Sequence, residues 1–372
     1  MRKLFILMAC AALLFLSCEF PFGPDPSDPD DPNDPDYPDY AVTESEIAYV
    51  KGKLALASTN GDSVSFYAAF GEFRPIPSSV KAHVLVLMYH QITDGSKRAA
   101  GRAVDYSEDS TAYQRTKSQF EADMAYLRDN GYIVIGFDDF LKIRRGMMTA
   151  PGEKMVIISF DDGWKSQYDH AFPVLKQFGY KASFALITSL VGNPSYTRYM
   201  DWNHVREMAR YRNSKGEILF SFASHSTTHP DSGLVAGHSD IWALKGNVPQ
   251  QDESAFQAYL KFLKYELLKS ASDLYLRVPE NRNAEMPLVL TLPKGMGSGH
   301  IELAAMAVQQ GYDIIRTSDS RDSNDPDDGL GYYGAINVFS QTMYNQYKLP
   351  SVAIHNDTAI EDCVPKYFAY FK

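Results

Sequence analysis

The sequence predicts an α/β fold in which parallel strands alternate with crossover helices. Short apolar runs such as residues 156–160 have the length and the β-branched content of buried strands. Stretches with helical periodicity lie between these runs, and the stretch at 116–130 is followed by Gly131, a typical helix stop. This alternation is typical of a closed barrel or of an open sheet, and periodicity alone does not choose between the two.

The predicted elements follow one another from residue 84 to residue 316. Glycines at 179 and 311 end two of the helices. Strands are expected at 84–89, 132–136, 156–160, 182–187, 218–223, 288–292 and 313–316, and helices at 116–130, 139–145, 168–178, 204–211, 254–270 and 301–310.

The N-terminus has the pattern of an export signal. Two basic residues follow Met1, and the apolar run at 4–16 is too short for a transmembrane span. Leu-Phe-Leu-Ser-Cys at 14–18 resembles a bacterial lipobox, which implies that Cys18 becomes the lipid-bearing N-terminus. The alternative is an ordinary secretory signal with an incidental cysteine. We therefore expect an exported protein that a lipid anchors to a bacterial membrane.

An acidic, proline-punctuated tract at 18–40 follows the signal and has the composition of an extended tether. The formal net charge of −10 argues against nucleic acid as a partner. Of the three cysteines only Cys363 would remain unmodified, so no intramolecular disulfide is expected, and we expect a monomer. The chain then divides into a lipoprotein signal peptide at 1–17, the tether, an N-terminal appendage at 41–82 and one catalytic domain at 83–372.

Two adjacent carboxylates, Asp161 and Asp162, stand between the strand at 156–160 and Gly163. Catalytic groups of α/β enzymes occupy this position, where a strand ends in a loop. Successive residues point in different directions, so one carboxylate can face a metal and the other a substrate or water. A plain Asp-Gly turn is the alternative reading of these residues alone.

A pair of histidines, His225 and His229, follows the strand predicted at 218–223. Their i, i+4 spacing would place both imidazoles on one side of a helical turn, within reach of one ion. Because the two aspartates sit at the same end of a neighbouring predicted strand, a carboxylate and two imidazoles can converge. Three protein ligands with open positions are the pattern of a catalytic metal site.

These residues resemble a known family. Ser-Phe-Asp-Asp-Gly at 159–163 and His-Ser-Thr-Thr-His-Pro at 225–230 are similar to the first two motifs of polysaccharide deacetylases, the NodB-homology group of carbohydrate esterases. Val-Leu-Met-Tyr-His-Gln-Ile at 86–92 and Phe-Asp-Asp-Phe-Leu at 137–141 resemble the branch that acts on poly-N-acetylglucosamine. The resemblance runs from about residue 83 to the C-terminus and implies a distorted (β/α)₇ barrel with a short N-terminal appendage.

The resemblance also implies roles for the four residues of the two motifs. Asp162, His225 and His229 would be metal ligands, and Asp161 would be the general base. Zinc suits histidine and carboxylate ligands best, and cobalt, nickel and iron fit them too.

The later motifs depart from the family's pattern. Pro293 matches it, but Lys294 stands where the family has an aromatic residue, and no arginine precedes the proline. A backbone N–H at Lys294 can still serve the oxyanion, whereas the arginine that would orient Asp161 is expected to be missing. Lys294 either substitutes for it or is solvated. Trp164 is the candidate for lining the substrate cleft.

The segment at 352–357 resembles the family's last motif, a strand that ends in a catalytic histidine. His355 is then the candidate general acid, and Asp319 is a weak candidate for orienting it. A competing alignment matches Leu-Pro-Ser-Val at 349–352 to a different strand of the family and leaves His355 without a catalytic role.

The predicted function is that of a metal-dependent deacetylase that hydrolyses N-acetyl or O-acetyl groups of a polysaccharide or oligosaccharide. One alternative is a hydrolase of another non-peptide C–N bond. The other is a glycan-binding lipoprotein that keeps the metal site but has little or no turnover, which the altered motif at Lys294 favours.

Overall fold

The computed structural model describes residues 40–58, 69–70, 82–94, 113–229, 252–282, 286–295, 300–318, 336–337, 347 and 349–369. The chain separates into two compact units, 1–41 and 42–372, and all the described helices and strands belong to the second unit. The export signal, Cys18 and the tether lie outside the described residues, so they stay predictions.

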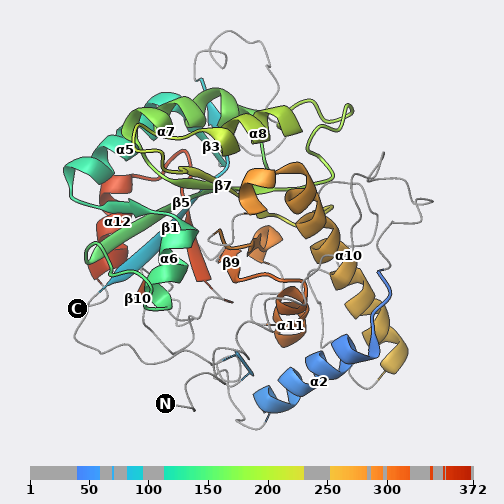
Figure 1. Ribbon diagram of the computed structural model, residues 1–372. Coiled ribbons are helices and arrows are strands. Elements are labelled where there is room, and N and C mark those ends of the chain that lie inside the picture. The colour runs from blue at the N-terminus through green and yellow to red at the C-terminus, as the bar shows by residue number, and fades with distance from the viewer. Residues whose placement is uncertain are drawn as a thin grey trace, which may run out of the picture. The chain divides into compact units, whose positions relative to one another are not determined.

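Seven parallel strands close into a barrel (Figure 1). Their order around the barrel is β1, β11, β9, β8, β7, β6 and β5, and the ring closes because β1 pairs with β5 from His83 opposite Lys154 to Tyr89 opposite Phe160. This closure decides between the barrel and the open sheet, and it confirms the predicted (β/α)₇ fold. The strands are β1 (His83–Tyr89), β5 (Lys154–Phe160), β6 (Ala182–Leu186), β7 (Phe220–Ser224), β8 (Val289–Thr291), β9 (Ile314–Ser318) and β11 (Leu349–Ala353).

Four shorter strands lie outside this ring. β4 (Ile133–Ile135) pairs in parallel with the first half of β5, and β10 (Ile336–Asn337) pairs antiparallel with the start of β1. β2 (Gln91–Thr93) and β3 (Gln114–Thr116) form a separate parallel pair. Among the described residues β7 and β8 pair at a single position, Ser224 with Leu290, so the barrel is distorted at this joint.

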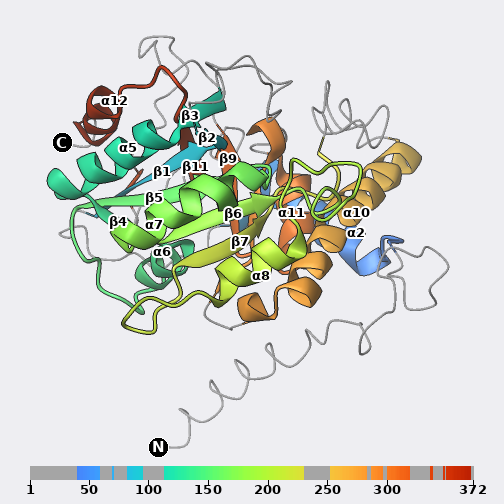
Figure 2. The same cartoon turned by 90° about the horizontal axis from the view of Figure 1, so that it is seen from above.

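Helices connect the strands and cover the outside of the barrel. α5, α7 and α8 lie side by side along one flank in two perpendicular views (Figures 1 and 2). No helix in the described part of the chain combines the length and the apolarity that a membrane span requires. The helices are α2 (Glu44–Ser58), α5 (Lys117–Asp129), α6 (Phe137–Arg144), the π-helix η2 (Gln167–Ala171), α7 (Phe172–Phe178), α8 (Trp202–Arg210), α10 (Glu253–Arg277), the 3₁₀ turns η3 (Pro279–Arg282) and η4 (Pro293–Gly295), α11 (Ile301–Gln309) and α12 (Ile360–Ala369).

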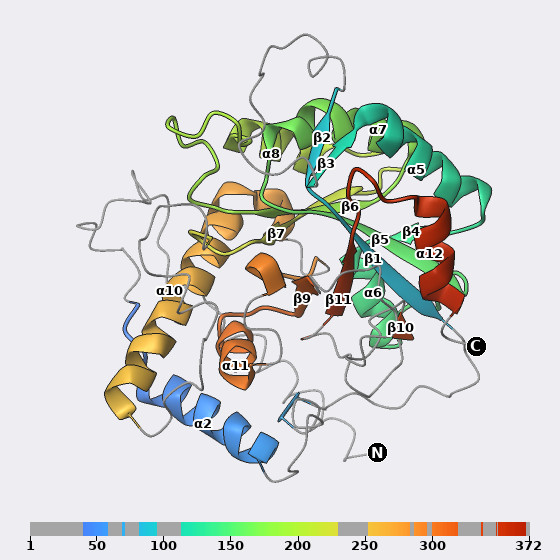
Figure 3. The same ribbon diagram turned by 180° about the vertical axis from the view of Figure 1, so that it is seen from behind.

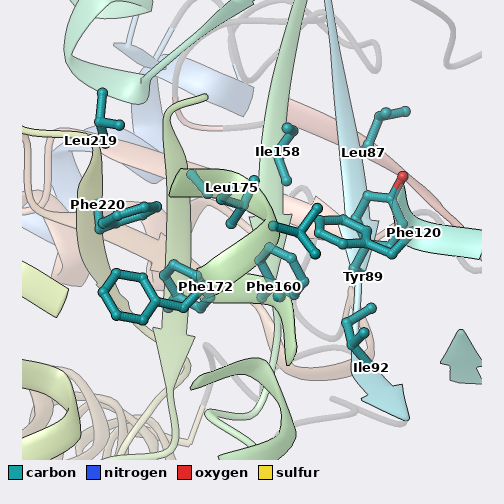
Figure 4. Close-up of a cluster of buried hydrophobic side chains, with 14 of the residues drawn as sticks. Leu87, Tyr89, Ile92, Phe120, Ile158, Phe160, Phe172, Leu175, Leu219 and Phe220 are labelled. Carbon is teal, nitrogen blue, oxygen red and sulfur yellow. The ribbon is translucent and has the colours of Figure 1, made fainter. Parts of the chain in front are cut away.

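Strand alternation divides the core into two layers. Leu85 and Leu87 of β1 belong to the cluster shared with α5 and α7, whereas Val84 and Val86 belong to the cluster shared with α6. Figure 4 shows the first cluster, in which aromatic rings from neighbouring strands and helices pack together. Within it, the rings of Phe160 of β5 and Phe184 of β6 stack with centroids 4.8 Å apart.

Two helices that the sequence patterns did not predict depend on tertiary contacts. α2 contains Gly52, a weak helix former, and packs against α11 (Figure 3). Its Glu46 accepts hydrogen bonds from Lys264 of α10 at 3.0 Å and from Gln310 at 3.1 Å. α12 contains Pro365 within the helix and packs against α5. Docking therefore stabilises segments whose local sequence is a weak signal.

Candidate metal centre and catalytic residues

One edge of the barrel collects the residues that the motifs predict. The pairs Asp161–Asp162 and His225–His229 follow β5 and β7, and His355 follows β11. β6 separates β5 from β7, so these two strands are not the neighbours that we expected. The motifs still meet, because all parallel strands of a closed barrel present their carboxyl ends at the same edge.

The turn after β5 separates the two carboxylates. Asp162 has φ 74° and Gly163 has φ 81°, so two successive residues occupy the left-handed region. A Cβ on Gly163 would lie 2.9 Å from Cδ2 of Leu186, which explains why glycine stands there. The left-handed conformation of a non-glycine residue costs about 1–3 kcal/mol and is typical of functional sites. The left-handed conformation points the side chain of Asp162 toward His225, whereas that of Asp161 meets Arg316.

Asp162, His225 and His229 form a compact set of candidate metal ligands. One ligand atom from each residue lies within 4.8 Å of the ligand atoms of the other two. Nε2 of His225 is 3.3 Å from Oδ1 of Asp162, and the two imidazole centroids are 5.1 Å apart. The structure thus brings together the three residues that the motifs predict as ligands.

The local reason for this convergence differs from the predicted one. The segment from His225 to His229 is a loop and not a helical turn, since Ser226 and His229 have positive φ angles of 65° and 54°. The backbone N–H of His229 donates to Oγ of Ser226 at 3.3 Å, which holds the turn. The i, i+4 spacing therefore identified the two histidines that converge, but the predicted helical turn between them was wrong.

Hydrogen bonds orient two of the three candidate ligands. Nδ1 of His225 donates to the carbonyl of Thr291 at 3.0 Å, so Nε2 is the ring atom that faces Asp162. Nε1 of Trp164 donates to Oδ2 of Asp162 at 2.8 Å, which leaves Oδ1 toward His225. Orienting bonds of this kind accompany most histidine and carboxylate metal ligands. The donor set of two nitrogens and a carboxylate therefore fits a divalent ion such as zinc.

The charges of the three groups are coupled. Burial raises the pKa of Asp162, but the hydrogen bond from His225 and the charges of His90, His225 and His229 outweigh it and hold this pKa well below its usual range. Burial lowers the pKa of His225, and the carboxylates of Asp161 and Asp162 more than reverse this, so its pKa is raised. Asp162 is therefore ionised at neutral pH, as a metal ligand must be.

Asp161 is held by Arg316, a residue that the motifs did not predict. Asp161 is 2% exposed and Arg316 is fully buried, and Nη2 of the arginine lies 2.5 Å from both carboxylate oxygens. Nη1 of Arg316 donates to Oγ of Ser351 at 2.7 Å, and Nε donates to Oγ1 of Thr291 at 3.3 Å. Hydrogen bonds to β8 and β11 thus fix the guanidinium, and Asp161 is paired in the interior.

This pair corrects one expectation. An arginine orienting Asp161 was expected to be missing because none precedes Pro293, yet Arg316 on β9 supplies it from another strand. A sequence signal existed: Arg316 interrupts the apolar strand that begins with Ile314 and Ile315, and a buried arginine requires a carboxylate partner.

The turn at η4 holds the two remaining residues of the altered motif. Pro293 is buried and Lys294 is exposed, with φ 53°. Because Arg316 already pairs with Asp161, Lys294 is not required as a substitute arginine. A role of the Lys294 backbone N–H at the oxyanion stays a prediction.

Trp164 has a different environment from the predicted one. The side chain is 4% exposed and stacks on Tyr199 with ring centroids 4.4 Å apart. The guanidinium of Arg198 lies 5.3 Å from the Trp164 ring. The buried ring supports Asp162 through its indole N–H, and little of its face is available to line a cleft.

His355 lies at a second part of the same edge, together with His90 and Tyr113. The ring centroid of Tyr113 is 5.0 Å from those of both His90 and His355. Nη1 of Arg115 donates to the carbonyls of His355 at 2.8 Å and Thr358 at 2.9 Å, which anchors the loop after β11. The acid role of His355 stays a prediction, and Asp319 lies outside the described residues.

Comparisons with known proteins support the motif assignment. Residues 149–259 match the family model described as polysaccharide deacetylase. This range contains Asp161, Asp162 and the loop with His225 and His229, and the match confirms the predicted resemblance.

Two curated relatives extend this match. YxkH of Bacillus subtilis (strain 168), which bears a provisional polysaccharide deacetylase name, is 28% identical over 179 residues, covering 48% of this chain and 50% of that protein. Poly-beta-1,6-N-acetyl-D-glucosamine N-deacetylase of Escherichia coli (strain K12) is 27% identical over 237 residues, covering 57% of this chain and 33% of that protein. The chain thus matches half of the first relative's length and a third of the second's.

Solved structures share the barrel. The deacetylase PplD of Streptococcus pyogenes aligns with a TM-score of 0.53 at 16% identity, covering 77% of this chain and 98% of that one. A de-N-acetylase from Aggregatibacter actinomycetemcomitans aligns with a TM-score of 0.54 at 19% identity, covering 77% and 99%. At these identities the likeness establishes the fold.

Proposed function

We propose that this chain, whose motif segments resemble those of polysaccharide deacetylases, is a metal-dependent hydrolase that removes acetyl groups from a polysaccharide. The observation behind the proposal is the division of labour between two adjacent carboxylates. Asp162 faces two imidazoles, whereas Asp161 faces a buried arginine. Hydrolysis of an acetamide needs one site for an ion and a separate base, and the turn supplies both.

Asp162, His225 and His229 would hold the ion, with zinc as the best fit and cobalt, nickel or iron as possible replacements. A bound divalent ion supplies Lewis acidity, which acidifies water and polarises the acetyl carbonyl. The hydrogen bonds from Trp164 to Asp162 and from His225 to the Thr291 carbonyl keep the ligand atoms turned inward.

Asp161 would act as the general base. The carboxylate accepts the proton of the water that attacks the acetyl carbon, while Arg316 holds it in place. The backbone N–H of Lys294 is the candidate donor to the oxyanion that develops. His355 is the candidate acid that protonates the amine as the C–N bond breaks, so that acetate and a free amino sugar leave.

An N-acetylated amino-sugar polymer is the proposed substrate. The E. coli relative is named for poly-β-1,6-N-acetyl-D-glucosamine, and the resemblance of residues 86–92 and 137–141 points to the same branch. A lipid anchor at Cys18 and an acidic tether would hold the enzyme near such a polymer outside the cytoplasm. O-acetylated polysaccharides are the alternative substrates.

Arg316 favours turnover over the glycan-binding alternative. The altered motif at Lys294, which lacks both the aromatic residue and the arginine, favours that alternative, but an arginine partner for Asp161 is present on another strand. The pairing of Asp161 with Arg316 therefore removes one argument against turnover.

The test is acetate release from acetylated chitooligosaccharides, acetylated xylan and poly-N-acetylglucosamine. The protein is stripped with a chelator and then reloaded with Zn²⁺ or Co²⁺. We expect release to stop after stripping and to return on reloading. Asp161→Asn is the matched variant, since it should bind metal like the unmodified protein while its turnover falls about 10²- to 10⁴-fold.

Two results would contradict the proposal. Acetate release that survives complete metal removal would exclude a metal-dependent reaction. Glycan binding without acetate from any of the three substrates would favour the binding lipoprotein.

A further inference from the structure

The loop between His225 and His229 rests on a buried carboxylate of α10. Glu266 is fully buried, and both of its oxygens face this loop. Oε2 accepts hydrogen bonds from the backbone N–H groups of Thr227 at 3.0 Å and Thr228 at 2.9 Å. Oε1 accepts a bond from Oγ1 of Thr228 at 2.6 Å. Two of the three residues between the candidate ligands, Thr227 and Thr228, are thus tied to one side chain.

A second pair of contacts ties the same helix to the start of the loop. One helical turn beyond Glu266, Oγ of Ser270 lies 2.7 Å from Oγ of Ser224, the last residue of β7. Oγ of Ser224 in turn accepts a bond from the N–H of Ser226 at 3.1 Å. In addition, Oγ1 of Thr227 donates to the carbonyl of Glu266 at 3.0 Å. Residues 224–228 are therefore fastened to one face of α10.

The backbone of this loop explains why an acceptor is needed. Ser226 and His229 are in the left-handed region, so residues 227 and 228 continue neither the strand nor a helix. Their N–H groups are buried and would otherwise lack ladder partners, and a buried donor without an acceptor costs about 1–3 kcal/mol.

Glu266 does not resemble an ordinary packing residue. Burying a carboxylate costs several kcal/mol, and among the described residues no Lys, Arg or His forms an ion pair with Glu266. Burial also raises its pKa, which the hydrogen bonds from Thr228 and Thr227 oppose. An apolar residue would fill the same space at lower cost, so the polar side chain is explained by the loop that it holds.

We propose that Glu266 is a positioning residue of the metal centre, which fixes the loop so that His225 and His229 face a common point before an ion binds. Glu266 does not itself act as a ligand, because its oxygens are engaged by the loop. The inference rests on one part of the function proposed above, namely that Asp162, His225 and His229 bind a metal ion. It does not depend on acetyl hydrolysis.

The test measures affinity for Zn²⁺ alone, by competition with a chromophoric chelator. Replacement of outer residues that orient metal ligands weakens affinity about 10- to 100-fold, and we expect this range for Glu266→Ala. Glu266→Gln should stay close to the unmodified protein, since an amide oxygen can accept both N–H bonds and the amide nitrogen can donate to Oγ1 of Thr228.

Asp273→Ala is the matched control. Asp273 is another buried carboxylate of α10, and it pairs with Lys269 at 2.8 Å instead of with the loop. Its loss should lower the melting temperature of the metal-free protein at least as much as the loss of Glu266, while Zn²⁺ affinity changes less than threefold. The visible spectrum of the Co²⁺ form should change for Glu266→Ala and not for Asp273→Ala.

Thr228→Val provides a milder second variant in case Glu266→Ala does not fold. It keeps the volume and removes one of the three bonds to the carboxylate, so a several-fold loss of Zn²⁺ affinity is expected.

Equal Zn²⁺ affinity in Glu266→Ala and the unmodified protein would overturn the inference. Equal weakening by Asp273→Ala would do the same, since it would show a general loss of stability. The acetate assay is independent of these outcomes: a protein that binds Zn²⁺ through His225 but releases no acetate contradicts the proposed deacetylase and not the role of Glu266.

Discussion

The edge of the barrel that carries the motif residues has two parts, and the structure holds them in different ways. In the metal part, which contains Asp162, His225 and His229, hydrogen bonds from Trp164 and to the Thr291 carbonyl orient the side chains themselves. The rim part contains His90, Tyr113 and His355. Here hydrogen bonds reach the backbone carbonyls of His90 and His355. The rings of both histidines contact the ring of Tyr113, which is 45% exposed. The difference indicates that the candidate ion site is preorganised, whereas the rim presents an exposed aromatic surface.

The same contrast appears in two of the buried arginines, Arg316 and Arg115. Arg316 pairs with Asp161, a side chain that would take part in the reaction. Arg115 pairs with Asp123, which also accepts a hydrogen bond from Tyr89, and directs Nη1 to the main chain of the loop with His355. One arginine therefore positions the candidate base, and the other positions a backbone segment.

The largest expected effect comes from His225→Ala. Removing one of three ligands should abolish stoichiometric zinc together with acetate release, because a carboxylate and one imidazole bind zinc weakly. Metal content is measured by mass spectrometry on the purified protein. His204→Ala is the control, since this histidine caps α8 and should leave metal content unchanged. Retention of one zinc per chain in His225→Ala would remove this residue from the ligand set.

Arg316→Ala tests the base and should leave the ion in place. Turnover should fall about 10²-fold or more, because Asp161 loses the group that holds it. Leaving Asp161 buried and unpaired should also lower the free energy of unfolding by about 3–5 kcal/mol. Urea unfolding and zinc content, measured together, separate this result from that of His225→Ala. Full turnover in a folded Arg316→Ala protein would show that Asp161 needs no partner.

Trp164→Phe probes the bond between the indole and Asp162. The phenyl ring keeps the stack on Tyr199 but removes the N–H donor, so zinc affinity should fall about tenfold. Chelator competition gives the affinity. Tyr199→Phe is the control because it preserves an aromatic ring against Trp164. An unchanged affinity in Trp164→Phe would mean that the carboxylate needs no orienting donor.

The smallest effect is expected at the rim, from Tyr113→Ala. Loss of a contact as large as an aromatic pair, about 0.5–1.5 kcal/mol, would raise KM for a polymeric substrate about two- to tenfold, while kcat and zinc content should stay unchanged. Because Tyr113 is exposed, the free energy of unfolding should change by less than about 0.5 kcal/mol. A fall in kcat with unchanged KM would instead show that Tyr113 acts in the reaction step and not in substrate binding. The rim and the metal part would then differ less in function.

Much of the fold could be predicted because its signals are local. Burial of β5, the turn at Asp162 and Gly163, and the helix stops at Gly131 and Gly179 all follow from residue types over a few positions. The helices α2 and α12 escaped prediction because Gly52 and Pro365 weaken their patterns and docking supplies the stability.

The sequence by itself determined the candidate ligand set, because Asp162, His225 and His229 follow strands in motifs that can be read locally. Only the tertiary structure decided which groups complete the site. Asp161 needed a buried cation, and the barrel supplied Arg316, which lies 155 positions away in the chain. The histidine loop needed an acceptor, and α10 supplied Glu266, which lies 39 positions beyond Thr227. Buried charges and hydrogen-bond donors must be paired. Strand order and helix docking select the partner, and no local sequence pattern encodes them.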